Sequence, residues 1–578
     1  MPAANPRNVR PMNAVVEFLR AGVQALQRRE PALARDRIAR ALALAPDHGE
    51  AWNILGVLAI SAGDAAAAES QFRRAAACAP ANPAYARSLA ECLKRQNRPA
   101  EARHLLAQAV RRGALSADLA CDLADLTLSP SLASSGPAAA LPLYRLALTL
   151  APDHARALNN RAETLAKAGR HDEAADAFAR LATLRGTAPA WLAAGSALLE
   201  AWRQDEARPA LRRAAALDPS IAGTWANLGF AALGRHAVEA AEASFARALR
   251  LAPDLAEARA GQGALLMLTG RLREGAAAYE ARLTLPHLAP PRRFDRPAWD
   301  GVVRPGRTLL VHADRGIGDA IQFIRYAPLL RARGMRVLFH GQAPLFELFR
   351  ASGVVDGVSD HDGPVPEHDA QIHVMSLMHR MGTDLDSVPA TIPAGVPYLR
   401  APEAAARRWA DRLAGVPGLK VGLVWSGSTV LPYHRQRSPG LEPLLPLTTI
   451  PGATPIALQV GPGRADLERF PPPGALLDLG AGIRDYADTA AILQALDLVV
   501  SVDTSVTHLA GALGRPVAVL LDQGAEWRWL RDRSDSPWYP TARLYRQSSF
   551  GDWSGPVERL RQDLDALVKR GGTPEDGR

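Results

Sequence analysis

The sequence of 578 residues contains few cysteines, few lysines and no long apolar segment. Cys78, Cys92 and Cys121 lie in helical-looking sequence without metal-ligand spacing, which predicts reduced core side chains of a cytosolic protein. No apolar run approaches the ~18 residues that a membrane helix requires. The N-terminal residues 1–13 lack the apolar stretch of a secretion signal. We therefore expect a cytoplasmic globular protein without a membrane span.

The positive charge of the chain is almost entirely arginine, because lysine stands only at positions 94, 167, 420 and 569. The net charge is +9 and the isoelectric point is about 9.8. A basic protein can bind nucleic acid, but here the arginines are interleaved with Asp and Glu. No DNA- or RNA-binding signature accompanies them. We expect no nucleic-acid partner.

The N-terminal half repeats with a period of 34 residues, the separation of Pro46 from Pro80 and of Pro219 from Pro253. Between these prolines, small and large residues alternate at helical spacing. This pattern is typical of tetratricopeptide repeats, which are pairs of antiparallel helices. A single repeat cannot bury its apolar face, so the units must stack into a superhelix with a concave surface. We expect about eight repeats over residues 15–288.

The concave surface of such an array is a candidate groove for a peptide or protein. Asn53, Asn160 and Asn227 lie near equivalent positions on the first helices of their repeats. Their amides are able to hydrogen-bond an extended peptide backbone, and we name them as candidate acceptor-binding residues. The alternative is that they satisfy contacts between helices.

The C-terminal half has a different pattern, in which apolar strands alternate with helices after a proline-rich stretch. Alternation of this kind predicts parallel sheets in an α/β fold. Two such halves predict a cleft between them. The expected divisions are a flexible N-terminus (1–14), the repeat superhelix (15–288), a connector (289–306), a first Rossmann-like half (307–400), a linker (401–418), a second half (419–548) and a C-terminal helix and tail (549–578).

The segment 498–521, LVVSVDTSVTHLAGALGRPVAVLL, predicts a buried strand, a polar turn, a short helix and a second strand. Hydroxyls of Thr504 and Ser505 are able to cap the helix. The helix begins at the carboxyl end of a strand, where open α/β sheets bind anions. We therefore expect the turn to hold the phosphate of an activated sugar.

The turn Gly316-Ile317-Gly318-Asp319 and the segment VDTSVTHLAGALGRP (502–516) together resemble the heptosyltransferase-like (GT9-like) glycosyltransferases of the GT-B fold. The resemblance covers roughly residues 307–548 and implies two Rossmann-like halves. It implies a glycosyltransferase that is inverting and metal-independent, with a nucleotide sugar as co-substrate and no cofactor. His361 between Asp360 and Asp362 imitates a metal site, but its turn-like context does not favour one.

Asp319 is the candidate catalytic base, a role that the resemblance assigns to the matching aspartate. The alternative is a carboxylate that caps the following helix. Gly316 and Gly318 allow a tight turn and a close approach of substrate. Arg435 and Arg437 are candidates to neutralise the leaving phosphate.

The remaining candidates for donor binding surround the anion. They are Ser426, Ser428, Gln459, Asp503, Thr504, Ser505, Thr507 and His508. Asp503 is expected to hold the turn together, since its charge repels an anion. His508 either donates to phosphate or packs as a core imidazole. The aromatic residues of 526–540 either stack on a base or sugar or form a packed cluster.

Joining a peptide-binding array to a sugar-transfer domain predicts a protein acceptor. The architecture is similar to the O-GlcNAc transferases, and bacterial flagellin glycosyltransferases pair the same two parts. The leading hypothesis is transfer of a sugar to a Ser or Thr hydroxyl, with flagellin as the first candidate acceptor. The alternatives are an enzyme acting on a surface glycan or lipopolysaccharide, and a non-catalytic scaffold with a degenerate domain.

Overall fold

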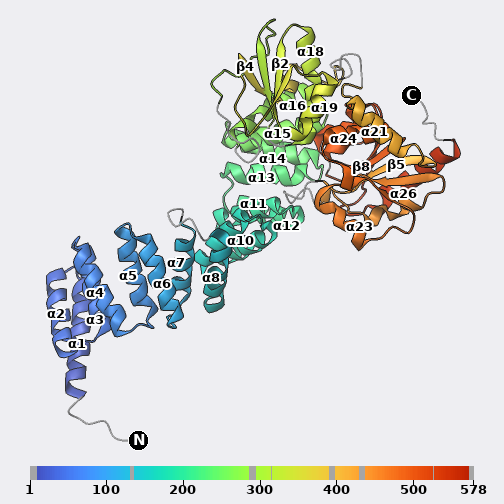
Figure 1. Cartoon of the computed structure of the whole chain (residues 1–578). Coiled ribbons are helices and arrows are strands. Elements are labelled where there is room, and N and C mark those ends of the chain that lie inside the picture. Colours follow the sequence, from blue (N-terminus) through green and yellow to red (C-terminus); the bar gives the residue numbers. More distant parts are fainter. Residues whose placement is uncertain are drawn as a thin grey trace. The chain divides into compact units, whose positions relative to one another are not determined.

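The computed structural model describes residues 9–129, 136–285, 294–313, 316–388, 397–427, 436–524 and 526–571 (Figure 1). The chain forms two compact units, Met1–Ala197 and Leu198–Arg578. Within the described residues, no helix has the length and apolar character needed to cross a membrane.

The first compact unit is built of helical repeats. Its helices are α1 (Val9–Gln27), α2 (Pro31–Leu44), α3 (Gly49–Ser61), α4 (Ala65–Cys78), α5 (Pro83–Arg95), α6 (Pro99–Arg111), α7 (Ala117–Thr127), α8 (Gly136–Leu150), α9 (Ala155–Lys167) and α10 (His171–Arg185). Each odd-numbered helix contacts the helix after it. Helix α1 begins inside residues 1–14, which we had expected to be flexible.

The second unit opens with further repeats of the same kind. After α11 (Ala188–Glu200), which crosses the division, come α12 (Gln204–Leu217), α13 (Ala222–Leu233), α14 (Val238–Leu251), α15 (Ala256–Leu268), α16 (Leu272–Tyr279) and the 3-10 helix η2 (Glu280–Thr284). Among the described helices, α1 to α10 and α13 to α16 contact one another in successive pairs, as is typical of tetratricopeptide repeats.

Small residues allow the paired helices to approach each other closely. A Cβ on Gly56 would lie 2.4 Å from Cε1 of Phe72, and one on Gly229 would lie 2.5 Å from Cε1 of Phe245. Both phenylalanines are buried. The alternation of small and large residues in the sequence is therefore confirmed as helix packing in these two repeats.

The first α/β half contains a four-stranded parallel sheet. Its elements are β1 (Thr308–His312), α17 (Ile317–Phe323), η3 (Ile324–Tyr326), α18 (Ala327–Ala332), β2 (Arg336–Gly341), η4 (Ala343–Leu345), α19 (Phe346–Ser352), β3 (Gly357–Asp360), β4 (Ala370–His373) and α20 (Ser376–Arg380). The strand order is β3-β2-β1-β4. His312 pairs in register with His340 on one side and with His373 on the other.

The second α/β half contains a six-stranded parallel sheet of order β10-β9-β8-β5-β6-β7. Its strands are β5 (Leu419–Val424), β6 (Ala453–Ala457), β7 (Leu477–Asp478), β8 (Leu498–Val502), β9 (Val517–Leu521) and β10 (Ala542–Arg546). Its helices are α21 (Glu403–Leu413), η5 (Glu442–Thr449), η6 (Gly461–Ala465), α23 (Asp466–Arg469), η7 (Gly480–Gly482), α24 (Tyr486–Gln494), α25 (Ser505–Ala512), η8 (Trp527–Trp529) and α26 (Ser554–Lys569).

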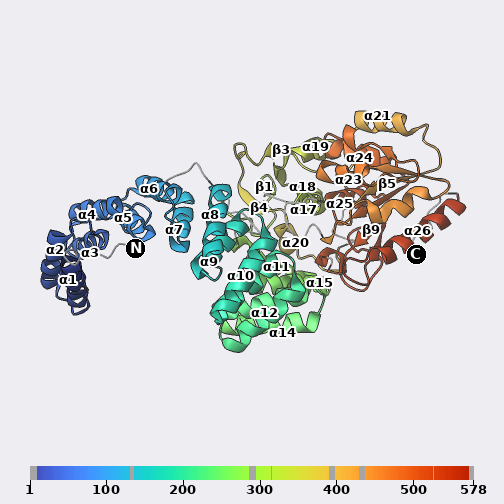
Figure 2. The ribbon, with the colours of Figure 1, turned by 90° about the horizontal axis from the view of Figure 1, so that it is seen from below.

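In each sheet the strand order reverses at one point. The point lies between the strands that come first and fourth in the sequence of that half. That point lies between β1 and β4 in the first half and between β5 and β8 in the second. Open α/β sheets bind ligands at the carboxyl ends of strands beside such a point. Helices α17 and α25, which follow β1 and β8, contact each other (Figure 2).

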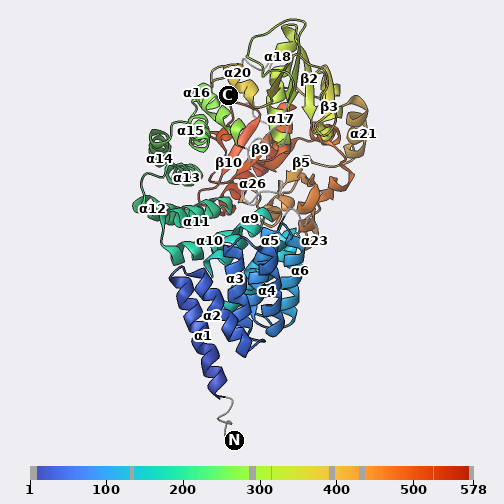
Figure 3. The same ribbon diagram turned by 90° about the vertical axis from the view of Figure 1, so that its left-hand side faces the viewer.

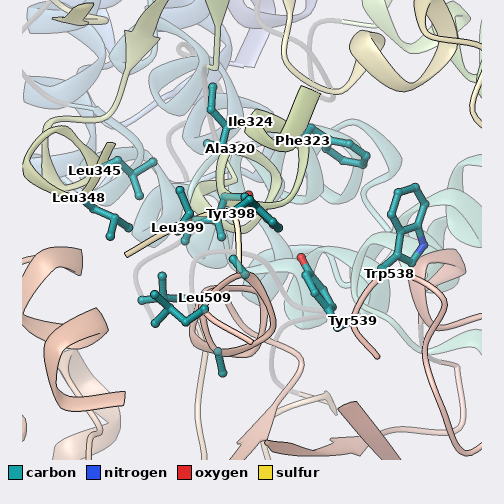
Figure 4. Close-up of a cluster of buried hydrophobic side chains, with 14 of the residues drawn as sticks. Ala320, Phe323, Ile324, Leu345, Leu348, Tyr398, Leu399, Leu509, Trp538 and Tyr539 are labelled. Atoms are coloured by element: carbon teal, nitrogen blue, oxygen red, sulfur yellow. The ribbon is translucent and has the colours of Figure 1, made fainter. Parts of the chain in front are cut away.

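One hydrophobic core joins the two halves. Ala320 and Phe323 of the first half lie beside Leu509 and Tyr539 of the second (Figure 4). The fully buried Arg325 is in this core, where its guanidinium donates to the Trp538 carbonyl and to the Tyr398 hydroxyl. A buried cation needs such partners, because an unpaired charge away from water is strongly unfavourable.

The last repeat belongs to the same core. Helix α15 contacts η8 of the second half, and α16 contacts α20 of the first half (Figure 3). Met267, Leu268, Leu272 and Ala276 are buried among residues of the α/β core. The change of sequence pattern near residue 288 and the division into compact units at residue 197 therefore fall at different places.

The C-terminal helix α26 packs on the second half alone among the described contacts. Its buried residues Val557, Leu560 and Leu564 join a cluster with residues of β5 and β8. The apolar face of α26 covers one face of the six-stranded sheet.

Candidate active site

The structure brings the two sequence motifs of the C-terminal half together. A Cβ on Gly318 would lie 2.8 Å from Cδ2 of His508 and 3.7 Å from Cα of Ser505. Gly318 is in the first turn of α17, while Ser505 and His508 are in α25. The absence of a side chain at position 318 permits this close approach of the two helices.

Asp319 lies in the first turn of α17, with 28% of its side chain exposed. Its carboxylate folds back over the helix start, since Oδ2 occupies the space 2.3 Å from where a Gly316 Cβ would be. Arg528 of η8 donates to Oδ1 of Asp319. Burial raises the pKa of Asp319 above its ordinary value, while the Arg528 guanidinium opposes that rise.

Arg528 is a buried cation that serves three acceptors. Besides Asp319, its guanidinium donates to Glu526 and, from Nε, to Oε1 of Gln322 over 2.8 Å. Burial opposes the charge on Arg528, but Asp319 and Glu526 outweigh burial and raise its pKa. The sequence analysis missed Arg528, because one arginine in an arginine-rich segment carries no distinguishing signal.

His508 is held as a neutral core imidazole. Its Nδ1 lies 3.0 Å from the Tyr539 hydroxyl, and its ring stacks on Trp529 with a centroid separation of 5.6 Å. Burial, with the positive charge of Arg528, lowers its pKa to about 3. This geometry corresponds to the packing alternative. The aromatic residues of 526–540 likewise form a packed cluster in the described structure.

The hydroxyls of the 503–508 turn are hydrogen-bonded within the protein, whereas we had named Thr504, Ser505 and Thr507 as candidates to bind the donor. Thr507 is fully buried and donates to the Val502 carbonyl over 2.7 Å. Thr504 Oγ1 lies 3.1 Å from Ser501 Oγ, and no side chain caps α25. Ser505 Oγ lies 2.5 Å from the Tyr486 hydroxyl. What this turn presents to an anion is the uncapped helix terminus.

Asp503 and Arg437 form an ion pair beside this turn. Arg437 Nη1 lies 3.2 Å from Asp503 Oδ2, and Asp503 is only 5% exposed. Asp503 therefore orients an arginine at the carboxyl end of β8, and its role in holding the turn together stays a prediction. Arg435 and Ser428 lie outside the described residues.

Gln459 holds the loop after β5. Both polar atoms of its side chain are used in hydrogen bonds within the protein. Its Oε1 accepts from the amides of Trp425 and Ser426, and its Nε2 donates to the carbonyls of Ser426 and Val460. These hydrogen bonds assign Gln459 to holding the loop, and its contact with the donor stays a prediction. Its hydrogen bonds position Ser426 and Gly427, and a Cβ on Gly427 would lie 3.2 Å from Thr504 Cγ2.

Asp522 is a second residue that the sequence analysis missed. It follows β9 directly and is only 8% exposed. Burial, together with the nearby charge of Asp503, raises its pKa to about 7. Its position at the end of an apolar strand was the available signal.

The last repeat also reaches the first half near its winding reversal. Arg282 of η2, 4% exposed, donates to Oγ of Ser376 and to Oε1 of Glu280. Its Nη2 lies 3.5 Å from Nδ1 of His373, the last residue of β4. Burial and then the Arg282 charge hold the pKa of His373 well below its usual range.

The repeat asparagines do not form one ladder. Asn227 precedes the packing residue Gly229 by two positions, whereas Asn53 precedes its counterpart Gly56 by three, so the two side chains differ in direction by about one residue's turn. Nδ2 of Asn160 donates to Asp125 of α7 over 2.8 Å. For Asn160 the structure matches the alternative of a contact between helices.

Side chains able to share a metal ion come together at Asp360, His361 and Asp362, in the search of the described residues. Both aspartates are exposed. The group follows β3, the edge strand of its sheet, and not the strands at the winding reversal.

The chain has helical repeats followed by two Rossmann-like halves, and the turns before α17 and α25 lie where these two helices contact each other. This arrangement is that of a helical-repeat protein with a GT-B-like α/β domain. Comparison with known families agrees. The chain matches the tetratricopeptide repeat family over residues 19–83 and 132–190, and glycosyltransferase family 9 (heptosyltransferase) over residues 482–529. The chain is thus a tetratricopeptide-repeat protein with a C-terminal domain like those of glycosyltransferase family 9.

The chain is similar to one particular relative and, in part, to two solved structures. The chain is 26% identical over 455 residues to Protein FlbA of Caulobacter vibrioides, covering 73% of this chain and 74% of that protein. The crystal structure of YrrB, a TPR protein with an unusual peptide-binding site, is 20% identical, with a TM-score of 0.28 over 32% of this chain and 95% of its own. Pseudomonas aeruginosa pilF is 20% identical, with a TM-score of 0.30 over 36% of this chain and 94% of its own.

The family 9 match covers α24, β8, α25, β9 and η8. It therefore includes the 503–508 turn, Asp522 and Arg528, and it supports glycosyltransferase activity. The repeats indicate protein interaction, and the transferase domain indicates a nucleotide sugar.

Proposed function

We propose that this chain is an inverting, metal-independent glycosyltransferase of the cytoplasm that moves a sugar from a nucleotide donor to a protein. The acceptor is a Ser or Thr hydroxyl of a polypeptide held by the repeats, with flagellin as the lead candidate. The observation that carries the proposal is the close approach of the Gly318 turn to the start of α25. The Asp319 carboxylate is on α17, and the uncapped N-terminus belongs to α25, the helix that α17 contacts.

Asp319 acts as the base in this proposal. Its carboxylate takes the proton of the acceptor hydroxyl while the hydroxyl oxygen bonds to the anomeric carbon. The bond from that carbon to the donor phosphate breaks on the opposite face, which inverts the configuration. The pKa of Asp319, raised by burial, makes it a better proton acceptor than an exposed aspartate. Arg528 keeps it ionised before the transfer.

The departing nucleotide phosphate is stabilised from the other side of the cleft. Amides at the uncapped start of α25 donate to it, and Arg437 supplies positive charge next to Asp503. His508 is neutral at physiological pH and supports α25 by packing. Neither a metal nor a cofactor has a step in this proposed mechanism.

The experiment is an incubation of the full chain with a panel of nucleotide sugars and purified flagellin, followed by intact-mass measurement. The proposal expects a mass gain equal to one or more sugar residues. Asp319→Asn, which keeps the size of the side chain, should lose this gain while nucleotide affinity stays unchanged.

Other outcomes distinguish the alternatives. A sugar transferred to lipopolysaccharide or another surface glycan, with protein unmodified, would show a glycan acceptor. No transfer to any acceptor from any donor, together with retained protein binding by the repeats, would show a non-catalytic scaffold.

A further inference from the structure

A polar cavity of about 230 Å³ opens between the repeats and the second half, within the second compact unit. One wall is the loop after α13, with Arg235 and His236. Another wall is the carboxyl edge of the sheet, where Gln523 follows β9 and Gln547 follows β10. Ligands of open α/β sheets bind at this edge.

The cavity is rich in positive charge. Arg235, Arg531 and Arg546 all line it, against a single lining carboxylate, Asp532. Asp205 pairs with Arg235 at 2.5 Å from outside the lining, but 75% of its side chain is exposed. A solvent-exposed partner compensates little of a guanidinium's charge. Guanidiniums that line one cavity repel one another, and an anion between them offsets that repulsion.

A buried donor faces the same space. Gln547 is 5% exposed, and its Nε2 has no hydrogen-bond partner. Its Oε1 is already used by the Gly551 amide at 3.3 Å. A buried N–H₂ without an acceptor is unfavourable relative to a paired one. The cavity therefore offers a hydrogen-bond donor, Gln547 Nε2, for which the protein supplies no acceptor.

Two of the cavity arginines are held in place by partners of their own. Arg546 donates from Nη2 to the Trp529 carbonyl over 2.6 Å, which fixes its guanidinium. Arg531 is paired on its Nε side, 3.3 Å from Asp532 Oδ2. His236 and Asp532 both have positive φ, at 53° and 50°. The positive φ of His236 recurs at the same turn of other repeats, at Gly63, Asn97 and Gly270, so it belongs to the repeat fold.

We propose that this cavity binds the carboxylate or phosphate group of a small molecule. The Arg235, Arg531 and Gln547 side chains donate to its oxygens, and Arg546 adds charge. The volume is below the range of about 300–1,000 Å³ for sites of drug-sized ligands, so the occupant is an anionic group or compact anion. The cavity is lined from the ends of β9 and β10, whereas the proposed donor turn follows β8.

Arginine footprinting of the intact protein tests this site. Phenylglyoxal modification is followed residue by residue with mass spectrometry, at constant ionic strength, with added inorganic phosphate, citrate or neutral glucose. Arg235 and Arg531 are accessible reporters, since 35% and 34% of their side chains are exposed. Arg543, on the same strand as Arg546 and 64% exposed, is the control.

The expected result is a saturable loss of reactivity, roughly fivefold or more, at Arg235 and Arg531 but not at Arg543. Protection by phosphate at lower concentration than by citrate identifies a phosphate site, and the reverse identifies a carboxylate site. Arg437 reports separately on the proposed donor turn, so protection there alone does not count as support.

A substitution series completes the test. Arg531→Gln should raise the anion concentration for half-protection of Arg235 roughly tenfold, because a charged hydrogen bond is lost. Arg543→Gln should leave it unchanged. Equal effects of the two substitutions, equal protection at Arg543, or no saturable protection at Arg235 and Arg531 would overturn the proposal.

Discussion

Gly318 and His508, 190 positions apart in the sequence, are so close that a methyl group at position 318 would lie 2.8 Å from the imidazole Cδ2. His508 cannot withdraw easily, because Trp529 and Tyr539 enclose its ring. The contact sets the spacing of α17 and α25, and with it the spacing of Asp319 from the start of α25. Several consequences can be measured.

Gly318→Ala should destabilise the protein by about 1–3 kcal/mol, the usual range for overpacking a tight contact. Shifts in the urea midpoint of the α/β unfolding transition would show this. Gly415→Ala is the matched control, since a Cβ there meets no atom within 4 Å. An equal midpoint for the two variants would contradict the contact.

Removal of the Arg528 charge should shift the pH dependence of transfer. Arg528 favours the ionised form of Asp319, so Arg528→Gln should raise the pKa of Asp319 further. The acid limb of the rate profile should then move to higher pH by about one unit or more. The measurement is kcat/KM against pH for the proposed reaction.

Two variants control for indirect effects. Arg528→Lys keeps the charge and should restore much of the wild-type limb. Arg533→Gln removes an arginine that pairs with Asp535 nearby and should leave the limb in place. If Arg533→Gln shifted the limb as much as Arg528→Gln, a local electrostatic cause would be excluded.

Asp522→Asn should stabilise the protein at high pH. The pKa of Asp522 is about 7 in the folded chain and about 3.9 when unfolded. Between these values the folded state binds the extra proton, so stability falls as pH rises towards 7. Above pH 7 the buried Asp522 carboxylate is ionised, and its full unfavourable contribution to stability is present. Unfolding at pH 5 and pH 8 should show the variant gaining about 2 kcal/mol relative to wild type across that interval.

If Asp522→Asn instead lost stability relative to wild type between pH 5 and pH 8, the Asp522 carboxylate would be in a favourable ion pair. Asp497→Asn is a control, because Asp497 also adjoins the same sheet but is 41% exposed, with Lys420 3.6 Å away. It tests whether removal of any carboxylate beside this sheet produces the change expected for Asp522→Asn.

Truncation should separate the two compact units. A chain of residues 187–578 keeps α11 and the later repeats, and should fold and retain nucleotide affinity. A chain of residues 286–578 lacks Met267, Leu268, Leu272 and Ala276 of the α/β core. Burial of large apolar side chains contributes about 1.5–3 kcal/mol each. Their loss is comparable to the whole stability of a typical domain, roughly 5–15 kcal/mol.

Circular dichroism melting and nucleotide titration of both truncated chains provide the measurement. A cooperative melt of the 286–578 chain at the wild-type temperature would show that the last repeat is only an appendage. Loss of folding in the 187–578 chain would show that the first unit is needed for the second.

Periodicity predicted the repeats and strands well, because helix packing and sheet burial repeat at fixed intervals along the chain. Gly56 and Phe72 pair as their spacing indicated. Single polar side chains were harder to predict. Thr507 and Gln459 resemble ligand contacts in sequence, but their hydrogen bonds go to the protein itself.

Arg528 shows what sequence reasoning lacked. It meets Asp319 across 209 positions, and nothing local distinguishes it from neighbouring arginines. Arg282 was missed for the same reason. Asp522 had a local signal in its place after an apolar strand, but its raised pKa depends on burial and on Asp503 from another element.

Local order was determined by the sequence itself: helical repeats, then strand–turn–helix units, with glycines at 316 and 318 and a polar turn at 503–508. Each follows from interactions between residues near in the chain. Tertiary structure alone decided that the last repeat joins the α/β core, that Arg528 pairs with Asp319, and that the hydroxyls of Thr504 and Thr507 turn inward. Those outcomes depend on which charges and polar groups are desolvated together, and desolvation is a property of the packed molecule.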